Sequence, residues 1–185
     1  MTTQAAIVLV VALIVVLMVW AWARRRRSVH LREKFGPEYD HQVRSMKDRD
    51  RAEAELDRRA RRVEKLSIRP LAPVDRDRFA EQWRGEQARF VDDPRSAVHE
   101  ADRLVEEVMR QRGYPMGEFE QRAADISVDH PALVENYRAA HDIAVRSDRG
   151  SAATEELRQA MIHFRTLFED LLDDRMRGTA PAPAR

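Results

Sequence analysis

Residues 157–172, LRQAMIHFRTLFEDLL, carry the most regular hydrophobic pattern in this chain of 185 residues. Apolar side chains recur at alternating spacings of four and three residues, at Leu157, Met161, Phe164, Phe168 and Leu171. This period matches the turn of an α-helix, and neighbouring apolar residues widen the stripe to the width that a core-facing helix needs. The segment therefore predicts an amphipathic helix with one face buried in a helical core.

Upstream segments repeat the helical pattern and are bounded by capping signals, with helices expected at about 75–91, 94–112, 118–125 and 131–147. Asp75 and Asp93 are the expected N-caps of the first two, Gly113 is the expected C-cap of the second, and Asp129 or His130 is expected to cap the last. No segment alternates apolar and polar residues over strand length. We therefore expect an all-α fold in which residues 70–177 form a compact bundle of four or five helices.

The bundle is preceded by a charged neck, residues 28–69, and followed by a Pro/Ala tail, residues 178–185, that we expect to be disordered. Gly36-Pro37 should end a first helix at about Phe35. Residues 38–69, with sparse apolar positions, predict one long and largely solvated helix. Coiled-coil pairing through this helix should be weak, because charged residues fall where a heptad seam needs apolar ones.

Residues 1–27 read as a transmembrane anchor with a basic stop. Ala5–Ala23 is an uncharged run of nineteen residues, long enough as a helix to span about 28 Å, close to the hydrocarbon thickness of a bilayer. The predicted membrane-interface residues follow at its end: Trp20, Trp22, Arg24, Arg25, Arg26 and Arg27. The positive-inside rule places the N-terminus outside and the body in the cytoplasm, with the arginines against anionic headgroups.

A cleaved signal peptide is the competing interpretation, because Ala21-Trp22-Ala23 has the small-x-small form of a cleavage site. A signal peptide carries its positive charge before the apolar core, whereas here the charge follows it. The apolar run is also longer than a usual signal-peptide core. We therefore expect retention as a single-pass anchor in a plasma membrane, with export as the alternative.

Charge is distributed unevenly along the chain. Residues 24–69 hold 16 basic and 9 acidic residues, a net charge of +7, whereas residues 70–185 hold 17 and 23, a net charge of −6. Within the basic half, Arg58, Arg59, Arg61 and Arg62 form a cluster that nucleic acid could contact. Acidic residues surround this cluster and no stacking aromatic lies near it, so we expect no binding of nucleic acid.

The sequence contains no recognisable catalytic or metal-binding pattern. It has no cysteine, no glycine-rich phosphate loop, and only one Glu-x-x-His, at Glu38 to His41, whereas a di-iron bundle needs two. We therefore expect no metal, no cofactor and no enzymatic activity. An enzyme or enzyme subunit with a Glu/His/Arg site between helices stays the runner-up, and a pocket lined by His130, His141 or His163 would favour it.

Two loops, RGYP and SVDHP, are the candidates for a partner surface. Loops frequently carry binding residues, and we expect exposure of four side chains here: Tyr114, Pro115, His130 and Pro131. The alternative is that these residues only turn corners between helices.

Several longer motifs accompany these loops, namely FGPEYD, IRPL, RFVDDP, ADRLVEEVMRQRGYP, FEQRAADISVDHP, YRAAH and TEELRQAM. Through them the stretch from about Leu31 to Leu172 resembles a family of bacterial membrane-anchored or "secreted" helical proteins with no assigned activity. The resemblance implies a bacterial source and assigns no functional residue. Together with the anchor, it leads us to expect a membrane-anchored cytoplasmic interaction or scaffold protein with an unidentified protein partner.

Overall fold

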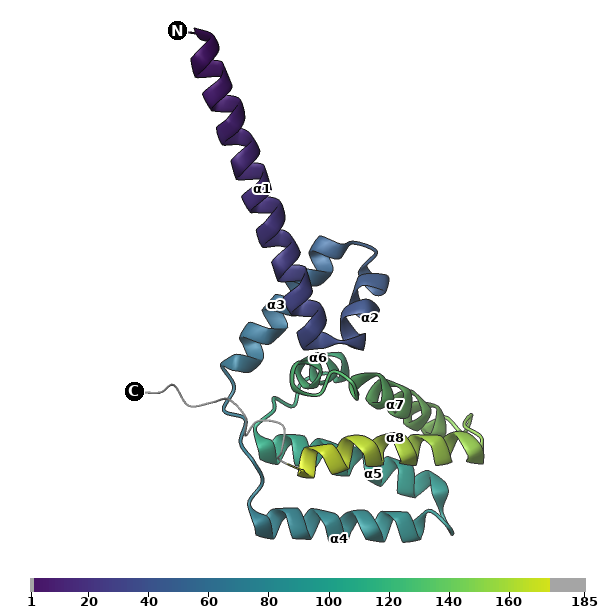
Figure 1. Ribbon diagram of the computed structural model, residues 1–185. Coiled ribbons are helices and arrows are strands. Elements are labelled where there is room, and N and C mark those ends of the chain that lie inside the picture. Colours follow the sequence, from purple (N-terminus) through teal and green to yellow (C-terminus); the bar gives the residue numbers. More distant parts are fainter. Residues whose placement is uncertain (1, 174–185) are drawn as a thin grey trace. The chain divides into compact units, whose positions relative to one another are not determined.

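A computed structural model describes the backbone of residues 2–173 and the side chains of residues 11–173. The predicted all-α class is confirmed, since this part of the chain forms eight helices and no strand (Figure 1). The helices are α1 (Thr2–Phe35), α2 (Pro37–Met46), α3 (Arg49–Glu64), α4 (Pro73–Arg89), α5 (Pro94–Arg112), α6 (Phe119–Asp129), α7 (Val134–Asp148) and α8 (Thr154–Leu172). The predicted tail, residues 178–185, lies outside the described residues.

The chain divides into two compact units, Met1–Asp57 (unit 1) and Arg58–Arg185 (unit 2). The division falls within α3 and inside the predicted neck, rather than at its end. Five helices, α4 to α8, follow residue 70, in agreement with the expected bundle of four or five.

Unit 1 is a folded-back set of helices in place of the long solvated helix predicted for residues 38–69. Helix α1 ends at Phe35 as predicted, but α2 ends after ten residues, where Lys47 adopts a left-handed φ of 53°. The Asp48 carboxylate then accepts the backbone N–H groups of Asp50 and Arg51 at 3.0 and 3.2 Å, which starts α3. This break was missed because an Asp cap inside a charge-rich run looks like one more solvated residue.

Apolar residues are sparse in the sequence of residues 28–57, but several of them are buried in the fold. The buried ones are Leu31, Phe35, Tyr39, Ala52 and Leu56. They come from α1, α2 and α3, so each of these helices buries apolar surface. Three apolar residues of the neck, Tyr39, Leu56 and Val63, are therefore buried, whereas Met46 is 37% exposed.

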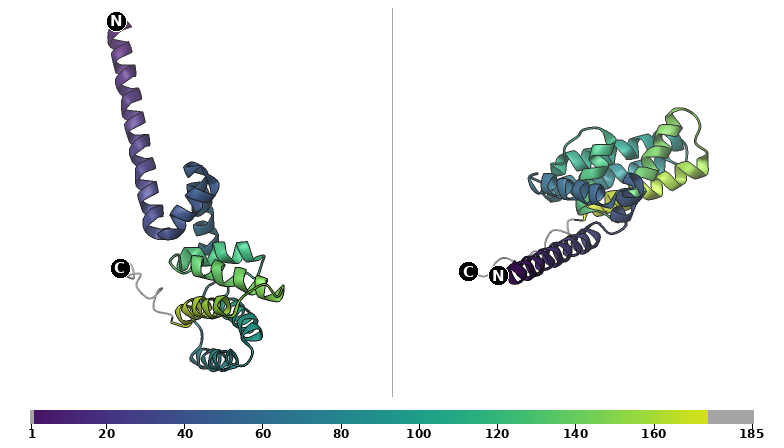
Figure 2. Two further views of the ribbon diagram at one scale, coloured as in Figure 1. Left: turned by 90° about the vertical axis from the view of Figure 1, so that its right-hand side faces the viewer. Right: turned by 90° about the horizontal axis from the view of Figure 1, so that it is seen from above.

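Unit 2 is organised around α5, which contacts α4, α7 and α8, while α7 also contacts α6 and α8. Figure 2 shows these helices from two further directions. The stripe predicted on α8 is confirmed as core, with Leu157, Met161, Phe164, Phe168 and Leu171 all buried. Trp83 of α4 stacks on Phe168 with ring centroids 4.7 Å apart, which closes the core on the α4 side.

In unit 2, the predicted helix ends are confirmed where the capping residue hydrogen-bonds within its own helix. Asp93 accepts the backbone N–H of Ser96 at 3.2 Å and starts α5. Gly113 ends α5 with a φ of 100°, and a Cβ there would lie 2.7 Å from the carbonyl oxygen of Ser67. Glycine is thus required at this position by both its backbone angle and the close approach of the preceding linker.

Two expected helix starts and one expected helix end are wrong. Helix α4 begins at Pro73 after Ala72, so Asp75 lies in its first turn instead of capping it. Helix α6 runs on to Asp129 because Ile126 and Val128 are buried by that extension. Helix α7 consequently starts only at Val134, and neither Asp129 nor His130 caps it.

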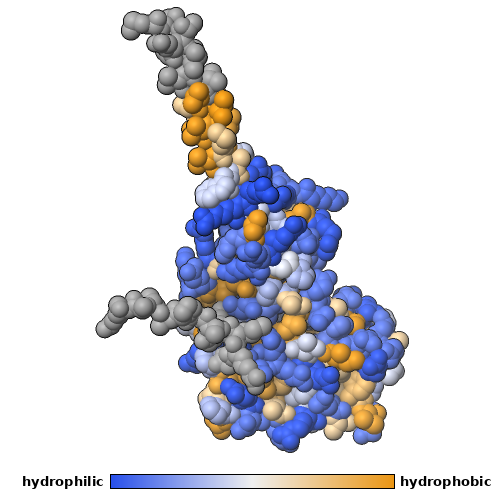
Figure 3. Space-filling model, viewed as in Figure 1, coloured by the Kyte–Doolittle hydropathy of each residue, from blue (hydrophilic) through white to orange (hydrophobic). Residues whose placement is uncertain are grey.

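Among residues 11–173, no helix combines the length and apolar character needed to cross a membrane. The predicted span, Ala5–Ala23, begins before that range, so its first six side chains lie outside the described residues. The described part of this run, from Val11 onward, is exposed on α1. In Figure 3 this apolar surface gives way to hydrophilic surface toward the C-terminal end of α1.

Candidate functional site

The four residues expected as a partner surface do not share one environment. Tyr114 is only 3% exposed and His130 only 6% exposed, so their predicted exposure is wrong. The Tyr114 hydroxyl donates to Asp129 at 2.8 Å, and His130 Nδ1 contacts the carboxylate of Asp170. Of the two prolines, Pro115 is exposed and Pro131 is half-buried. Polar contacts within unit 2 therefore hold both ring side chains inward.

A second group of polar residues lies between α5, α6 and α7. His141 Nδ1 is 3.0 Å from Asp102 Oδ2, and the His141 ring stacks on Phe119 with centroids 3.7 Å apart. Nearby, the guanidinium of Arg122 pairs with Glu106. These residues come from positions up to 39 apart in the chain, so only folding brings them together.

This group includes Tyr137, which is fully buried at the centre of unit 2. Burial raises the pKa of the Tyr137 hydroxyl, and the negative charge of Asp102 raises it further. Tyr137 is therefore a neutral phenol at physiological pH. A base that initiates chemistry needs the opposite tuning, toward a pKa near 7.

Two surface hollows of unit 2 lie away from the histidines that the enzyme alternative would need. One of about 370 Å³ is lined by charged residues of α4 and α5, including Arg78, Glu86, Glu100 and Arg103. Another of about 160 Å³ lies between α4 and α8, against Trp83 and Met161. Neither is lined by His130, His141 or His163. Within residues 11–173, no set of three or more His, Asp or Glu side chains is placed to hold a metal ion.

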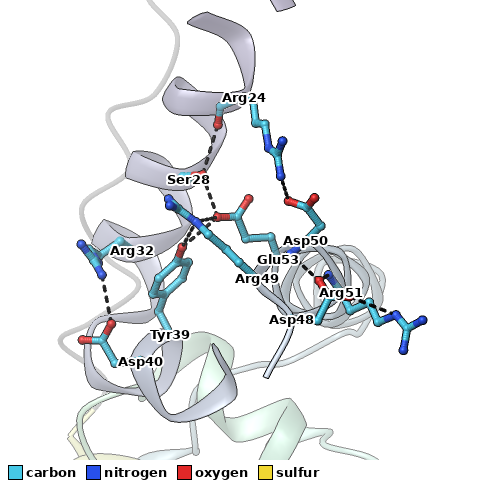
Figure 4. Close-up of polar contacts among 10 residues, drawn as sticks. All are labelled: Arg24, Ser28, Arg32, Tyr39, Asp40, Asp48, Arg49, Asp50, Arg51 and Glu53. Carbon is cyan, nitrogen blue, oxygen red and sulfur yellow. Dashed lines mark hydrogen bonds and ion pairs between the residues drawn. The ribbon is translucent and has the colours of Figure 1, made fainter. Parts of the chain in front are cut away.

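The most concentrated polar site of unit 1 is centred on Glu53 of α3, which is 3% exposed. Its Oε1 accepts three hydrogen bonds, from Ser28 Oγ of α1 at 2.6 Å, from the Tyr39 hydroxyl of α2 at 2.7 Å and from Arg49 Nε of α3 at 2.9 Å (Figure 4). We call these four residues the Glu53 clasp. It joins all three helices of unit 1 through one carboxylate oxygen.

The clasp also sets the protonation of its members. Burial by itself raises the pKa of Glu53, but the hydrogen bonds from Ser28, Tyr39 and Arg49 outweigh it and hold the pKa below its ordinary value. For Tyr39, burial and the bond to Glu53 raise the pKa of the hydroxyl. At neutral pH the carboxylate is therefore ionised and the phenol is a donor, which is the pattern that the three hydrogen bonds require.

This depressed pKa predicts acid sensitivity of unit 1. A carboxylate whose pKa is lower when folded stabilises the fold above its unfolded pKa, near 4.5, and this stabilisation is lost as the pH falls through the lower folded value. Amide hydrogen exchange in α2 should therefore accelerate as the pH falls from 5 to 3, after correction for the intrinsic rate. In a Glu53→Gln variant the same amides should show a flatter dependence. An equal dependence in both proteins would contradict this role.

The predicted membrane-interface residues, 20–27, immediately precede the clasp residue Ser28 on α1. Trp20 and Trp22 are 59% and 62% exposed, and the guanidinium groups of Arg24 and Arg26 each lie 5.3 Å from one of these rings. The other two arginines, Arg25 and Arg27, are also exposed. The boundary residues thus form an exposed aromatic and basic collar around α1.

Acidic residues of α3 hold two members of this collar. Arg24 pairs with Asp50, and Arg27 pairs with Asp57. A hollow of about 360 Å³ lies between the two helices and is lined partly by Trp20 and Ala23. The sequence indicated the collar from hydropathy alone, but it carried no signal that α3 returns to it, because the pairs are 26 and 30 positions apart.

Two arginines of the second cluster, Arg58 to Arg62, are buried or paired inside unit 2. Arg59 is 7% exposed, and Arg62 lies 2.7 Å from the buried carboxylate of Asp125. These contacts remove part of the cluster from the surface. The expected absence of nucleic-acid binding stays a prediction.

Comparison with protein-family models, curated proteins and solved structures finds no match to this chain. The resemblance through FGPEYD, RFVDDP, RGYP and SVDHP to bacterial membrane-anchored proteins therefore stays a prediction from those motifs. The functional argument rests on the collar, the clasp and the surfaces of the two units.

Proposed function

We propose that this protein is a single-pass membrane protein of a bacterial plasma membrane, with its N-terminus outside and its body in the cytoplasm. Residues 1–27 are the anchor, and unit 2 is an interaction or scaffold module for a protein partner. The Glu53 clasp gives the segment next to the membrane a defined structure.

One observation carries the anchor. From Val11 to Trp22 the large apolar side chains of α1 are 48–63% exposed and lie on all sides of the helix. A helix that is apolar all round needs either a large protein environment or lipid, because water solvates it poorly. The same apolar character extends back to Ala5 in the sequence, which completes a run of nineteen residues.

The orientation rests on the basic collar. No side-chain charge precedes the apolar run, whereas Arg24 to Arg27 follow it at once. Basic residues favour the cytoplasmic side and interact there with anionic headgroups, at about 1 kcal/mol for each residue. Trp20 and Trp22 have the amphipathic rings that favour the same interface.

The interaction role of unit 2 rests on how its ionisable groups are used. The histidines of the enzyme alternative, such as His130 and His141, contact Asp170 and Asp102 inside the bundle. Residues 70–185, which make up most of unit 2, have a net sequence charge of −6, and Val74 and Val91 are 73% and 82% exposed. Because both histidines already have carboxylate partners inside the bundle, we favour an interaction role over the enzyme alternative.

The anchor is tested by integration and topology. A reporter that works only in the cytoplasm, fused to the C-terminus of the full chain, should be active. The protein should also resist alkaline carbonate extraction. The double variant Ile14→Arg/Leu17→Arg should be extracted, because each arginine at the centre of a span costs about 2.5–3.5 kcal/mol. The matched control, Val74→Arg/Val91→Arg, places the same charges on exposed apolar sites of unit 2 and should stay in the membrane.

Two results would contradict the proposal. Recovery of a mature protein outside the cell beginning at Arg24 would favour the cleaved signal peptide. Equal extraction of the wild type and the α1 variant would remove the anchor. The scaffold role is tested separately by crosslinking the full chain in native membranes, with a form lacking residues 1–27 as control, and it fails if no reproducible partner is recovered.

A further inference from the structure

We propose that the turn between α2 and α3 is a second membrane contact, which binds the anionic headgroups of the lipid surface beside the anchor. The contact is a patch of four residues, Arg44, Met46, Lys47 and Arg51, which we call the turn patch. This inference rests on the proposed anchor and adds to it a lipid-binding surface that is not part of the transmembrane run or its arginine collar.

The position of the patch follows from the contacts between α1 and α3. Asp50 pairs with Arg24, the residue that opens the collar, and Ser28, one turn further along α1, donates to Glu53. The first turn of α3 therefore lies at the level of the collar, as Figure 4 shows for these pairs. In Figure 1 the connection between α2 and α3 lies beside the same part of α1.

The thickness of the headgroup layer makes this level significant. A bilayer is about 40–45 Å thick including its polar regions and about 30 Å thick in its hydrocarbon core, which leaves about 5–7 Å of headgroups on each side. One helical turn is about 5.4 Å. When Trp22 lies at the hydrocarbon boundary, side chains at the start of α3 are therefore within reach of phosphate groups.

The chemistry of the patch fits such a surface. Arg44, Met46, Lys47 and Arg51 are all exposed. The Arg51 side chain is 82% exposed, and Met46 is one of the few large apolar side chains of unit 1 exposed beyond the collar, at 37%. Basic groups around a shallow apolar anchor are the usual composition of an interfacial contact.

Acidic neighbours reduce the charge of the patch without cancelling it. Asp48 caps α3 and lies 3.2 Å from Arg51, and Asp50 is engaged by Arg24. Arg44 and Lys47 add two positive charges at the turn itself. The local balance therefore favours anionic headgroups over zwitterionic ones.

The turn is also held in place before it meets lipid. Lys47 closes α2 in a left-handed conformation, and its backbone N–H bonds to the carbonyl oxygen of Val43 at 3.0 Å. The Glu53 clasp then ties α2 and α3 to α1. A preorganised contact loses little conformational entropy on binding, so a few basic residues suffice.

The test uses the absence of cysteine from the chain, which allows a single label to be placed at Met46→Cys. The labelled full chain is reconstituted in nanodiscs of phosphatidylcholine alone, or with added phosphatidylglycerol, and quenching of an environment-sensitive dye by acrylamide is measured, because an uncharged quencher is not repelled by the anionic lipid. We expect at least fivefold weaker quenching with the anionic lipid. Arg44→Gln/Lys47→Gln should remove the difference, since each basic residue contributes about a fivefold factor, whereas the control Arg84→Gln/Arg103→Gln on unit 2 should not.

A second label, at Leu17→Cys, separates this inference from the anchor. Protection at position 17 with equal quenching at position 46 in both lipids overturns the turn patch and leaves the anchor. Exposure of both labels to acrylamide overturns the anchor itself. Position 46 could also be protected equally in both lipids, with no change in the Arg44→Gln/Lys47→Gln variant. That result would show that protein covers the label, and it would also overturn the turn patch.

Discussion

Replacing Glu53 with alanine is expected to lower the local free energy of unfolding of unit 1 by about 3–5 kcal/mol. The substitution removes the acceptor of three hydrogen bonds and leaves Ser28, Tyr39 and Arg49 without their common partner. This loss costs more than that of a surface ion pair, because the Ser28 and Tyr39 side chains stay buried without their acceptor, although Arg49 is exposed to solvent. The three helices of unit 1 would then be held by apolar contacts and by exposed ion pairs such as Arg24–Asp50 and Arg32–Asp40.

Amide hydrogen exchange measures this effect where it occurs. Protection of the α2 amides and of the α3 amides up to Asp57 should fall by two orders of magnitude or more in Glu53→Ala, while α8 should keep its protection. The matched control is Glu81→Ala on α4, whose carboxylate is 71% exposed in a surface pair with Arg84 and should cost less than about 0.5 kcal/mol. Unchanged exchange in α2 would remove the clasp as the element that holds unit 1 together.

Replacing Phe168 with alanine is the second large effect, expected to destabilise unit 2 by about 3–5 kcal/mol. Phe168 is 2% exposed and stacks on Trp83, so its removal opens a cavity and also deletes an aromatic contact. Because α8 contacts both α5 and α7, the surrounding side chains cannot collapse into the space without moving other helices.

Urea unfolding followed by circular dichroism checks this value in the full chain. The control is Val91→Ala, which removes apolar atoms from a side chain that is 82% exposed and should change the free energy of unfolding by less than about 0.5 kcal/mol. A loss below 1 kcal/mol for Phe168→Ala would mean that the stripe on α8 is not the centre of the core.

The aromatic and basic collar and the core helix were both accessible from the sequence because each depends on neighbours within a few positions. The stripe of α8 needs only side chains three and four residues apart, and the collar needs only the junction between an apolar run and four arginines. The same holds for Asp93 and Gly113, which cap their helix through contacts within three to five residues.

The wrong predictions for the loops and for residues 38–69 have one common source. Partners that are distant in the sequence replace water as the neighbours of polar side chains. Tyr114 and His130 look like exposed loop residues until Asp129 and Asp170 are brought to them by folding. Residues 38–69 look like one solvated helix until Asp48 caps a new helix and Glu53 meets Ser28 and Tyr39. A propensity argument assigns each of these charges to water, because it cannot supply a partner from another helix.

Short-range chemistry in the chain thus establishes the helical class, the apolar run with its basic stop, and the core face of α8. The folded arrangement adds the pairing of α1 with α3, and with it the Glu53 clasp and the level of the turn patch. The difference is physical: periodicity and capping act within one or two helical turns, whereas a buried carboxylate is stable only once donors some 14 and 25 positions away surround it.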